Sequence, residues 1–207
     1  MSLINAGSVL GGREAADIKA QIADNAALLP PPFDTSWYKT GYYYDAVYPY
    51  YTTIASRAAL SLDTLYLCKR KILDDVTFNE LSVNVTTEAA SSNVFYGVYA
   101  SDASGLPSTL LASGSASGAT TGVKSTAITL ALTKGQVVWD AYLNTGAGVG
   151  MTAFQHIFQG GALNAAANGT VLLNRTGHTS LPADASVGGA FAQLSSARIP
   201  RVALRAA

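Results

Sequence analysis

Residues 57–207 break up into short stretches in which apolar residues alternate with polar ones, separated by turns rich in Gly, Pro and Ser. Alternation with a period of two is the pattern of a β-strand with one buried face, and no helical periodicity interrupts it here. Many short strands without intervening helices build an antiparallel sandwich or barrel. Of the two, we expect a mainly β fold with a jelly-roll-like antiparallel β-sandwich.

The expected strands differ in how clearly the sequence marks them. The stretch 76–85 alternates in two phases that slip at Asn79–Glu80, which indicates a β-bulge. Segments 113–122 and 159–170, rich in Gly, Ala, Ser and Thr, are expected to be loops. The remaining strands are expected at 93–99, 109–112, 128–132, 136–143, 151–158, 171–173, 190–194 and 198–205.

Residues 12–29 carry the one helical pattern. Acidic residues stand early, where the helix dipole favours them, and Pro30 to Pro32 end the helix. This short helix is expected either to form a coiled coil or to lie as an amphipathic helix on its own domain or on a partner protein. The seam consists of Ala15, Ile18, Ile22, Asn25 and Leu29, whose spacing of three and four residues is that of a heptad.

Between the helix and the strands lies an extended connector rich in tyrosine. Seven of the eleven tyrosines fall between residues 38 and 53, and Pro49 argues against a regular central strand. We therefore expect three parts: an N-terminal docking adaptor at 1–35, a tyrosine-rich neck at 36–56 and the β-sandwich domain at 57–207.

The crowded tyrosines have three interpretations: core packing within the chain, an exposed sugar-binding platform, or a subunit interface. We favour the interface, because tyrosine is enriched there and loses little side-chain entropy when fixed. If a glycan binds, loop tips of the sandwich are the better place, with Trp139 and Tyr142 as candidates, although Trp139 fits the core better. The predicted interface residues are Ile18, Ile22, Leu29, Tyr42, Tyr43, Tyr44, Tyr48, Tyr50 and Tyr51.

The composition favours an assembly subunit. Charged residues make up 13% of the chain, against roughly 25% on average, so much of the surface is expected to lie against neighbours. The net charge of zero argues against nucleic-acid binding. The single cysteine, Cys68, is expected to be buried, and we expect neither a secretory signal nor a membrane span.

Catalytic motifs are not evident, and we expect no enzyme, cofactor or metal. Of the two histidines, His156 lies in an apolar strand pattern and His178 in a polar loop, where we expect it to be solvated. The pair Asp74–Asp75 fits a turn between strands, with a calcium ligand as the alternative. Acids that could serve glycoside hydrolysis are spread along the chain, without a sign that two converge.

The run from Tyr42 to Trp139 resembles a β-sandwich module of bacteriophage tail-fibre, head-fibre and baseplate proteins. The likeness rests on the lead-in GYYYDAVYPYYTT, on VTFNELSVNVTTEAAS and, most specifically, on GVYASDASGLPSTLLASG. It covers about half of the chain and carries no catalytic motif. The resemblance implies a phage virion structural protein, a short fibre or spike that docks through its N-terminus on other virion proteins.

Fibres of this kind are usually homotrimers, so the resemblance also implies a trimer, located in the virion, that displays its sandwich to a bacterial surface polysaccharide. The alternative is a purely architectural subunit, a capsid decoration or a tail-tip or baseplate piece without a receptor role. A depolymerase ranks third, because the resemblance brings no catalytic residues with it.

Overall fold

The computed structural model describes residues 37–45, 51–59, 61–146, 148–156, 172–193 and 198–207. The chain divides between Ser36 and Trp37, and the unit Trp37–Ala207 contains every described residue. The expected N-terminal helix, with Ile18, Ile22 and Leu29, lies outside the described residues, and so do Tyr48 and Tyr50.

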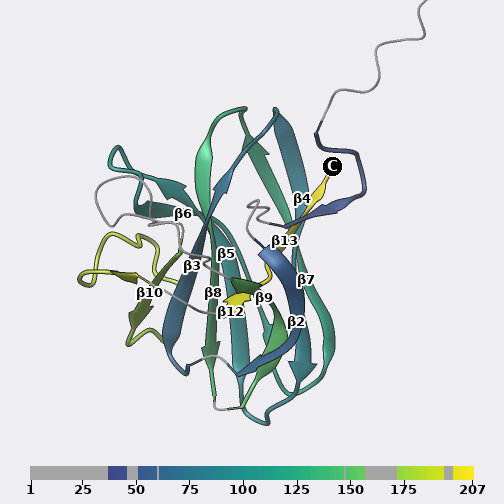
Figure 1. The fold of residues 1–207 in the computed structure, drawn as a ribbon, viewed down its shortest axis with the longest axis vertical. Coiled ribbons are helices and arrows are strands. Elements are labelled where there is room, and N and C mark those ends of the chain that lie inside the picture. The colour runs from purple at the N-terminus through teal and green to yellow at the C-terminus, as the bar shows by residue number, and fades with distance from the viewer. Residues whose placement is uncertain (1–36, 46–50, 60, 147, 157–171, 194–197) are drawn as a thin grey trace, which may run out of the picture. The chain divides into compact units, whose positions relative to one another are not determined.

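The described residues form two antiparallel sheets and contain no helix (Figure 1). The prediction of a mainly β fold with antiparallel sheets is therefore confirmed. The seven-stranded sheet consists of β1 (Tyr43–Tyr44), β2 (Tyr51–Ala59), β4 (Val76–Thr87), β7 (Gly122–Leu132), β9 (Gly150–His156), β12 (Arg198–Pro200) and β13 (Ala203–Ala206). The six-stranded sheet consists of β3 (Thr64–Lys71), β5 (Asn93–Ser101), β6 (Pro107–Ser117), β8 (Val137–Thr145), β10 (Leu172–Thr176) and β11 (Ala192–Gln193).

Side chains from both sheets meet in the larger core cluster. Strand β4 sends Phe78, Leu81 and Val83 into it, and β5 and β8 send in Tyr96 and Tyr142 from the other sheet. Between Phe78 and Leu81 the apolar phase changes, and the β4–β7 register shifts there between Phe78 and Glu80. The bulge that the sequence predicts at this place is therefore confirmed, and it keeps both halves of β4 facing the core.

The six-stranded sheet is buried on its other face as well. A second cluster contains Leu65 and Leu67 of β3, Trp139 of β8, Leu173 of β10 and Ala185 from the segment after β10. Burial on both faces explains why β3 reads as a nearly continuous apolar run instead of alternating. Cys68 of the same strand is buried, as expected, and so is Trp139.

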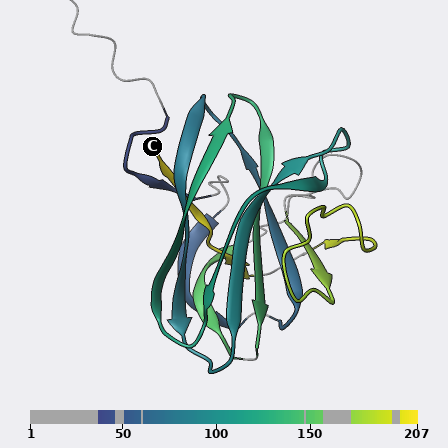
Figure 2. The same ribbon diagram turned by 180° about the vertical axis from the view of Figure 1, so that it is seen from behind.

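The two ends of the described unit lie side by side, as both views show (Figures 1 and 2). Tyr43 of β1 pairs with Arg205 of β13, and β13 in turn pairs with β4. The chain thus enters and leaves at the same edge of the seven-stranded sheet.

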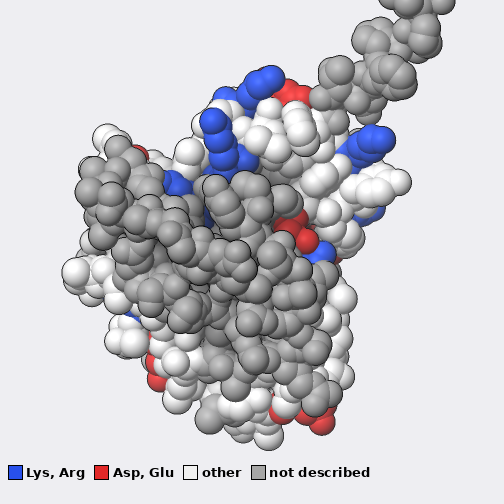
Figure 3. All heavy atoms as spheres, viewed as in Figure 1, with Lys and Arg blue, Asp and Glu red and all other residues white. Residues whose placement is uncertain are grey.

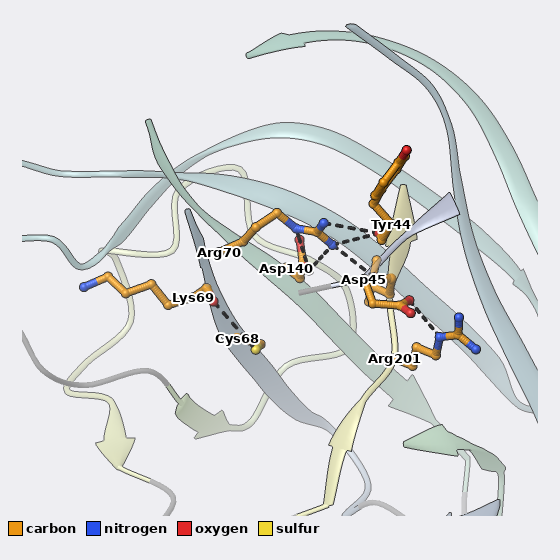
Figure 4. Close-up of polar contacts among 8 residues, drawn as sticks. Tyr44, Asp45, Cys68, Lys69, Arg70, Asp140 and Arg201 are labelled. Carbon is orange, nitrogen blue, oxygen red and sulfur yellow. Dashed lines mark hydrogen bonds and ion pairs between the residues drawn. The ribbon is translucent and has the colours of Figure 1, made fainter. Parts of the chain in front are cut away.

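A buried ion pair fastens these ends to the six-stranded sheet (Figure 4). The side chains of Arg70 on β3 and Asp140 on β8 are 4% and 2% exposed, and Arg70 Nη2 lies 2.6 Å from the Asp140 carboxylate. The guanidinium also donates to the carbonyl oxygens of Tyr44 at 3.2 Å and Val202 at 3.3 Å. One side chain therefore connects both sheets and both ends of the unit.

Burial and charge oppose each other in this pair. Burial alone would lower the pKa of the Arg70 guanidinium, but the charge and hydrogen bonds of Asp140 raise it above its usual value. Burial also raises the pKa of the Asp140 carboxyl, and Arg70 opposes that rise. Each side chain can therefore stay charged in its buried position only while the other is present.

The described part of the segment 36–56, which is expected to form the neck, contains two short pieces of strand. Residues 43–44 form β1 and residues 51–56 belong to β2, which pairs with β9 along most of its length. Strand β1 pairs with β13 and β2 with β9, and both partners lie far away in the sequence. The tyrosine-rich sequence therefore carries no local sign of these strands. The described part of this segment belongs to the compact unit Trp37–Ala207.

The expected loop 113–122 is shorter in the structure, since β6 continues to Ser117 and β7 begins at Gly122, which leaves only residues 118–121 between the strands. Its small residues are needed for close packing between these strands. A Cβ atom at Gly114 would overlap the Thr126 side chain and lie 2.7 Å from the Tyr96 ring. The composition that indicated a loop is instead that of a crowded strand.

Replacing Asp140 with Asn tests the buried ion pair. The variant keeps the shape of the side chain but leaves the Arg70 charge buried without a counterion, so the free energy of unfolding is expected to fall by about 3–5 kcal/mol. Urea denaturation at neutral pH measures it. The matched control is Asp45→Asn, which breaks the more exposed pair with Arg201 and is expected to lose about 1 kcal/mol or less. Equal losses in the two variants would contradict the assigned role of Asp140.

Candidate functional site

The first candidate site is a groove on the outer face of the seven-stranded sheet. On one edge of β4, β13 pairs as far as Ser82 and β9 starts at Val85, so Val83 and Asn84 between them pair only with β7 on the other edge. The gap in this ladder coincides with a groove of about 290 Å³. Its lining, which we call the outer groove, consists of Tyr43, Ser82, Val83, Asn84, Val123, Arg201 and Ala203.

Polar side chains around the outer groove are paired with one another. The Tyr43 hydroxyl donates to Glu80 at 2.7 Å, and the second oxygen of this carboxylate lies 3.9 Å from Arg205. Arg201 donates from Nε to Asp45 at 2.7 Å, the contact at the right of Figure 4. Both acids near the groove therefore have an arginine beside them.

These contacts also set the protonation of the groove. The hydrogen bond to Glu80 raises the pKa of the Tyr43 phenol, so this hydroxyl stays a donor at neutral pH. The hydrogen bond to Asp45 raises the pKa of Arg201, which keeps its charge. The groove therefore offers a ligand a hydrogen-bond donor and a cation.

Three aromatic side chains at the start of the domain, one of which lines the groove, are exposed to solvent. Trp37 is 65% exposed, Tyr42 64% and Tyr43 46%, all in the segment that follows residue 36. Large apolar side chains that are exposed this close together in sequence are typical of an interaction surface.

The predicted tyrosines thus separate into different environments. Tyr42 and Tyr43 are exposed, as an interface requires, but Tyr44 packs on the main core with its ring centroid 4.9 Å from that of Tyr38. Tyr51 begins β2, and its side chain lies outside the described part. Tyr142, the candidate for a sugar site, is 1% exposed and belongs to the core, so that expectation is wrong.

A second pocket lies on the outer side of the six-stranded sheet. It measures about 430 Å³ and lies between the turn after β5 and the segment that follows β10. We call it the edge pocket. Its lining consists of Asp102, Leu106, Pro107, Leu173, Ser186, Gly189, Ala190 and Phe191.

His178 lies near this pocket and is half-buried, not solvated as expected. Its Nε2 accepts a hydrogen bond of 2.7 Å from Nε of Arg175, so the imidazole must be neutral in this arrangement. Burial, with the Arg175 charge second, lowers the pKa of His178 below its usual range. The histidine is therefore a structural acceptor for a buried arginine.

The expected Asp74–Asp75 turn is present between β3 and β4, where Asp75 also accepts a hydrogen bond from the Lys134 backbone. Over the described ranges, no three His, Cys, Asp or Glu side chains gather as a metal site, and no helix long and apolar enough to cross a membrane occurs. These two findings concern that part of the chain alone.

Sequence reasoning missed most of the outer groove. Glu80, Ser82 and Asn84 stand at every second position of β4, and this outward alternation was the signal that could have indicated a polar sheet face. Arg201 and Arg205 reach the same place from the end of the chain, and nothing in the local sequence connects them to β4. Arg175 likewise gives no signal of its burial.

No protein-family model matches this sequence, and a search of curated proteins finds no match either.

Replacing His178 with Gln tests the neutral histidine. The unfolded chain binds a proton at this site near the usual histidine pKa of 6.5, whereas the folded chain binds it only at lower pH. The stabilisation is therefore present above that value and is lost as pH falls through the lowered folded pKa. Glutamine can accept the same hydrogen bond from Arg175 but does not titrate.

We expect the melting temperature of the wild type to fall relative to that of His178→Gln between about pH 7.5 and about pH 5. Thermal melts followed by circular dichroism measure both proteins in the same buffers. His156 is present in both and cancels in the difference. Two curves that stay parallel over this range would contradict a lowered His178 pKa.

Proposed function

We propose that this chain is a structural protein of a bacteriophage virion, a short fibre or spike built as a homotrimer. Residues 1–35 dock it on other virion proteins, and the following domain is a jelly-roll-like antiparallel β-sandwich. The proposal rests on the resemblance of residues 42–139 to fibre and baseplate modules, and two antiparallel sheets with a shared core agree with such a module.

The observation that carries the proposal is the exposed aromatic segment at the start of the domain. Trp37 and Tyr42 are each about two-thirds exposed, and both directly follow the segment proposed as the adaptor. A monomer that keeps such side chains in water gains nothing from them, whereas aromatic residues of this type are enriched in the centres of protein interfaces. We therefore assign Trp37, Tyr42 and Tyr43 to the contact between subunits.

The surface composition points in the same direction. Uncharged side chains make up most of the described surface on the face shown in Figure 3, and the basic ones gather toward its upper part. Strands β6 and β7 illustrate this, because Lys124 is the one charged residue in their combined sequence. Long strands with so little charge are suited to lie against another subunit.

A solution mass by light scattering tests the trimer, which is expected to have about three times the chain mass of 21.4 kDa. The double variant Tyr42→Ser/Tyr43→Ser is expected to shift the chain toward monomer, because it removes exposed rings without touching the core. The matched control is Leu62→Ser/Val187→Ser, which removes two exposed apolar side chains elsewhere. A wild-type monomer would favour the alternative, an architectural decoration subunit.

Deleting residues 1–35 tests the docking role. The remaining chain keeps both sheets and the Arg70 ion pair, so it is expected to fold and to give the same β-type circular dichroism. Incorporation into particles, measured by immunoblotting of purified virions, is expected to be lost. Normal incorporation of the folded deletion variant would refute the adaptor.

A further inference from the structure

Arg175 is a buried cation without a counterion in the described part of the chain. It stands on β10 and is 6% exposed. Its Nη1 donates to the carbonyl oxygens of Ala185 at 2.9 Å and Gly189 at 3.3 Å, and its Nε donates to His178. All three acceptors are neutral, and Nη2 has no hydrogen-bond partner.

The other deeply buried arginine shows how unusual this is. Arg70 is 3% exposed and has Asp140 at 2.6 Å, whereas none of the ion pairs among the described residues includes Arg175. A buried charge without a counterion is strongly unfavourable, and a buried donor without an acceptor adds to the penalty. An anion bound near Arg175 would relieve the penalty of the unbalanced charge.

The edge pocket gives an anion a place to bind. Two of its lining residues contact the guanidinium directly: the Gly189 carbonyl oxygen lies 3.3 Å from Nη1, and the guanidinium lies 4.7 Å from the centroid of the Phe191 ring. Gly188, beside this wall, has a φ of 109°, and a Cβ there would lie 3.4 Å from the guanidinium carbon. The pocket is thus separated from the charge only by one thin, glycine-rich layer.

We propose that the edge pocket binds a small organic carboxylate of about the size of one sugar ring, recognised by the buried charge of Arg175. The Phe191 ring and Leu173 supply an apolar wall for the body of the ligand, and the Ser186 hydroxyl supplies a polar contact. The volume of about 430 Å³ falls in the range of small-molecule sites. The inference does not depend on the proposed function.

Asp102 is the one acid that lines the pocket, and it weakens the attraction without cancelling it. Its Oδ1 already accepts hydrogen bonds from the backbone of Ser104 and Leu106, each at 2.8 Å. The side chain is exposed, so water and salt screen its charge. The Arg175 side chain is shielded from solvent, so water and salt screen its charge less than they screen that of Asp102.

The binding experiment is an NMR titration of the full chain labelled with ¹⁵N, at low salt and neutral pH. The probes are glucuronate, an acid on a sugar ring, benzoate, an acid on an apolar ring, and glucose, a neutral ring. Saturable shifts of the Gly189, Ala190 and Phe191 amides are expected with at least one of the acids and not with glucose. Binding of glucuronate alone would identify a sugar acid, and binding of benzoate alone an apolar acid.

Two variants with opposite expected effects test whether the charge of Arg175 attracts the ligand. Arg175→Gln is expected to abolish the saturable shifts. Asp102→Asn keeps the oxygen that accepts the two backbone hydrogen bonds but removes the opposing charge, so it is expected to tighten binding about twofold to fivefold, the range of a screened surface charge. Arg201→Gln in the outer groove removes the same charge elsewhere and is expected to leave the affinity unchanged.

The Asp102→Asn variant decides the matter if Arg175→Gln does not fold, because Asp102 is exposed and its backbone contacts are preserved. The proposal is overturned if neither acid gives saturable shifts at the pocket, if glucose binds as well as glucuronate, or if Arg201→Gln weakens binding as much as Arg175→Gln.

Discussion

The guanidinium of Arg70 lies where the two sheets and both ends of the domain meet, and much of the remaining structure depends on it. Asp140 balances its charge, while the carbonyl oxygens of Tyr44 and Val202 take its remaining donors. Strand β1 has only two residues, too few to hold the start of the domain by ladder hydrogen bonds alone. The buried arginine therefore determines where the exposed aromatic segment emerges, and with it the proposed contact between subunits.

The two buried arginines divide the tasks of structure and recognition. Arg70 forms an ion pair with Asp140, so its charge is balanced inside the domain. Arg175 has only neutral acceptors and stands behind the edge pocket, so its field remains available to a ligand. Two arginines that are both buried thus have different roles: Arg70 holds the domain together, and Arg175 is proposed to attract a ligand.

Local patterns predicted the strands well where one face is buried and the other solvated. The bulge at Phe78–Glu80 is an example, because the change in the alternation of apolar residues can be seen in neighbouring residues of the sequence. Prediction from composition was less successful where tertiary packing decides the structure. The small residues around Gly114 indicated a loop but belong to a closely packed strand. The tyrosine-rich segment gave no sign of strands β1 and β2. Of the site, the sequence indicated Tyr42, Tyr43 and Tyr44 together as interface residues, and it gave no sign that Tyr44 packs on the main core while the other two are exposed.

The sequence by itself determined that this chain is mainly β, that its surface is poor in charge, and that its tyrosines cluster near the start of the domain, since composition and period-two alternation are local properties. Only the tertiary structure decided that Arg70 meets Asp140 across 70 residues of chain, and that Arg175 is buried with no ion-pair partner among the residues the structure describes. Whether a charge is buried and paired depends on which strands, distant in the sequence, become neighbours in the fold, and the local sequence does not indicate this.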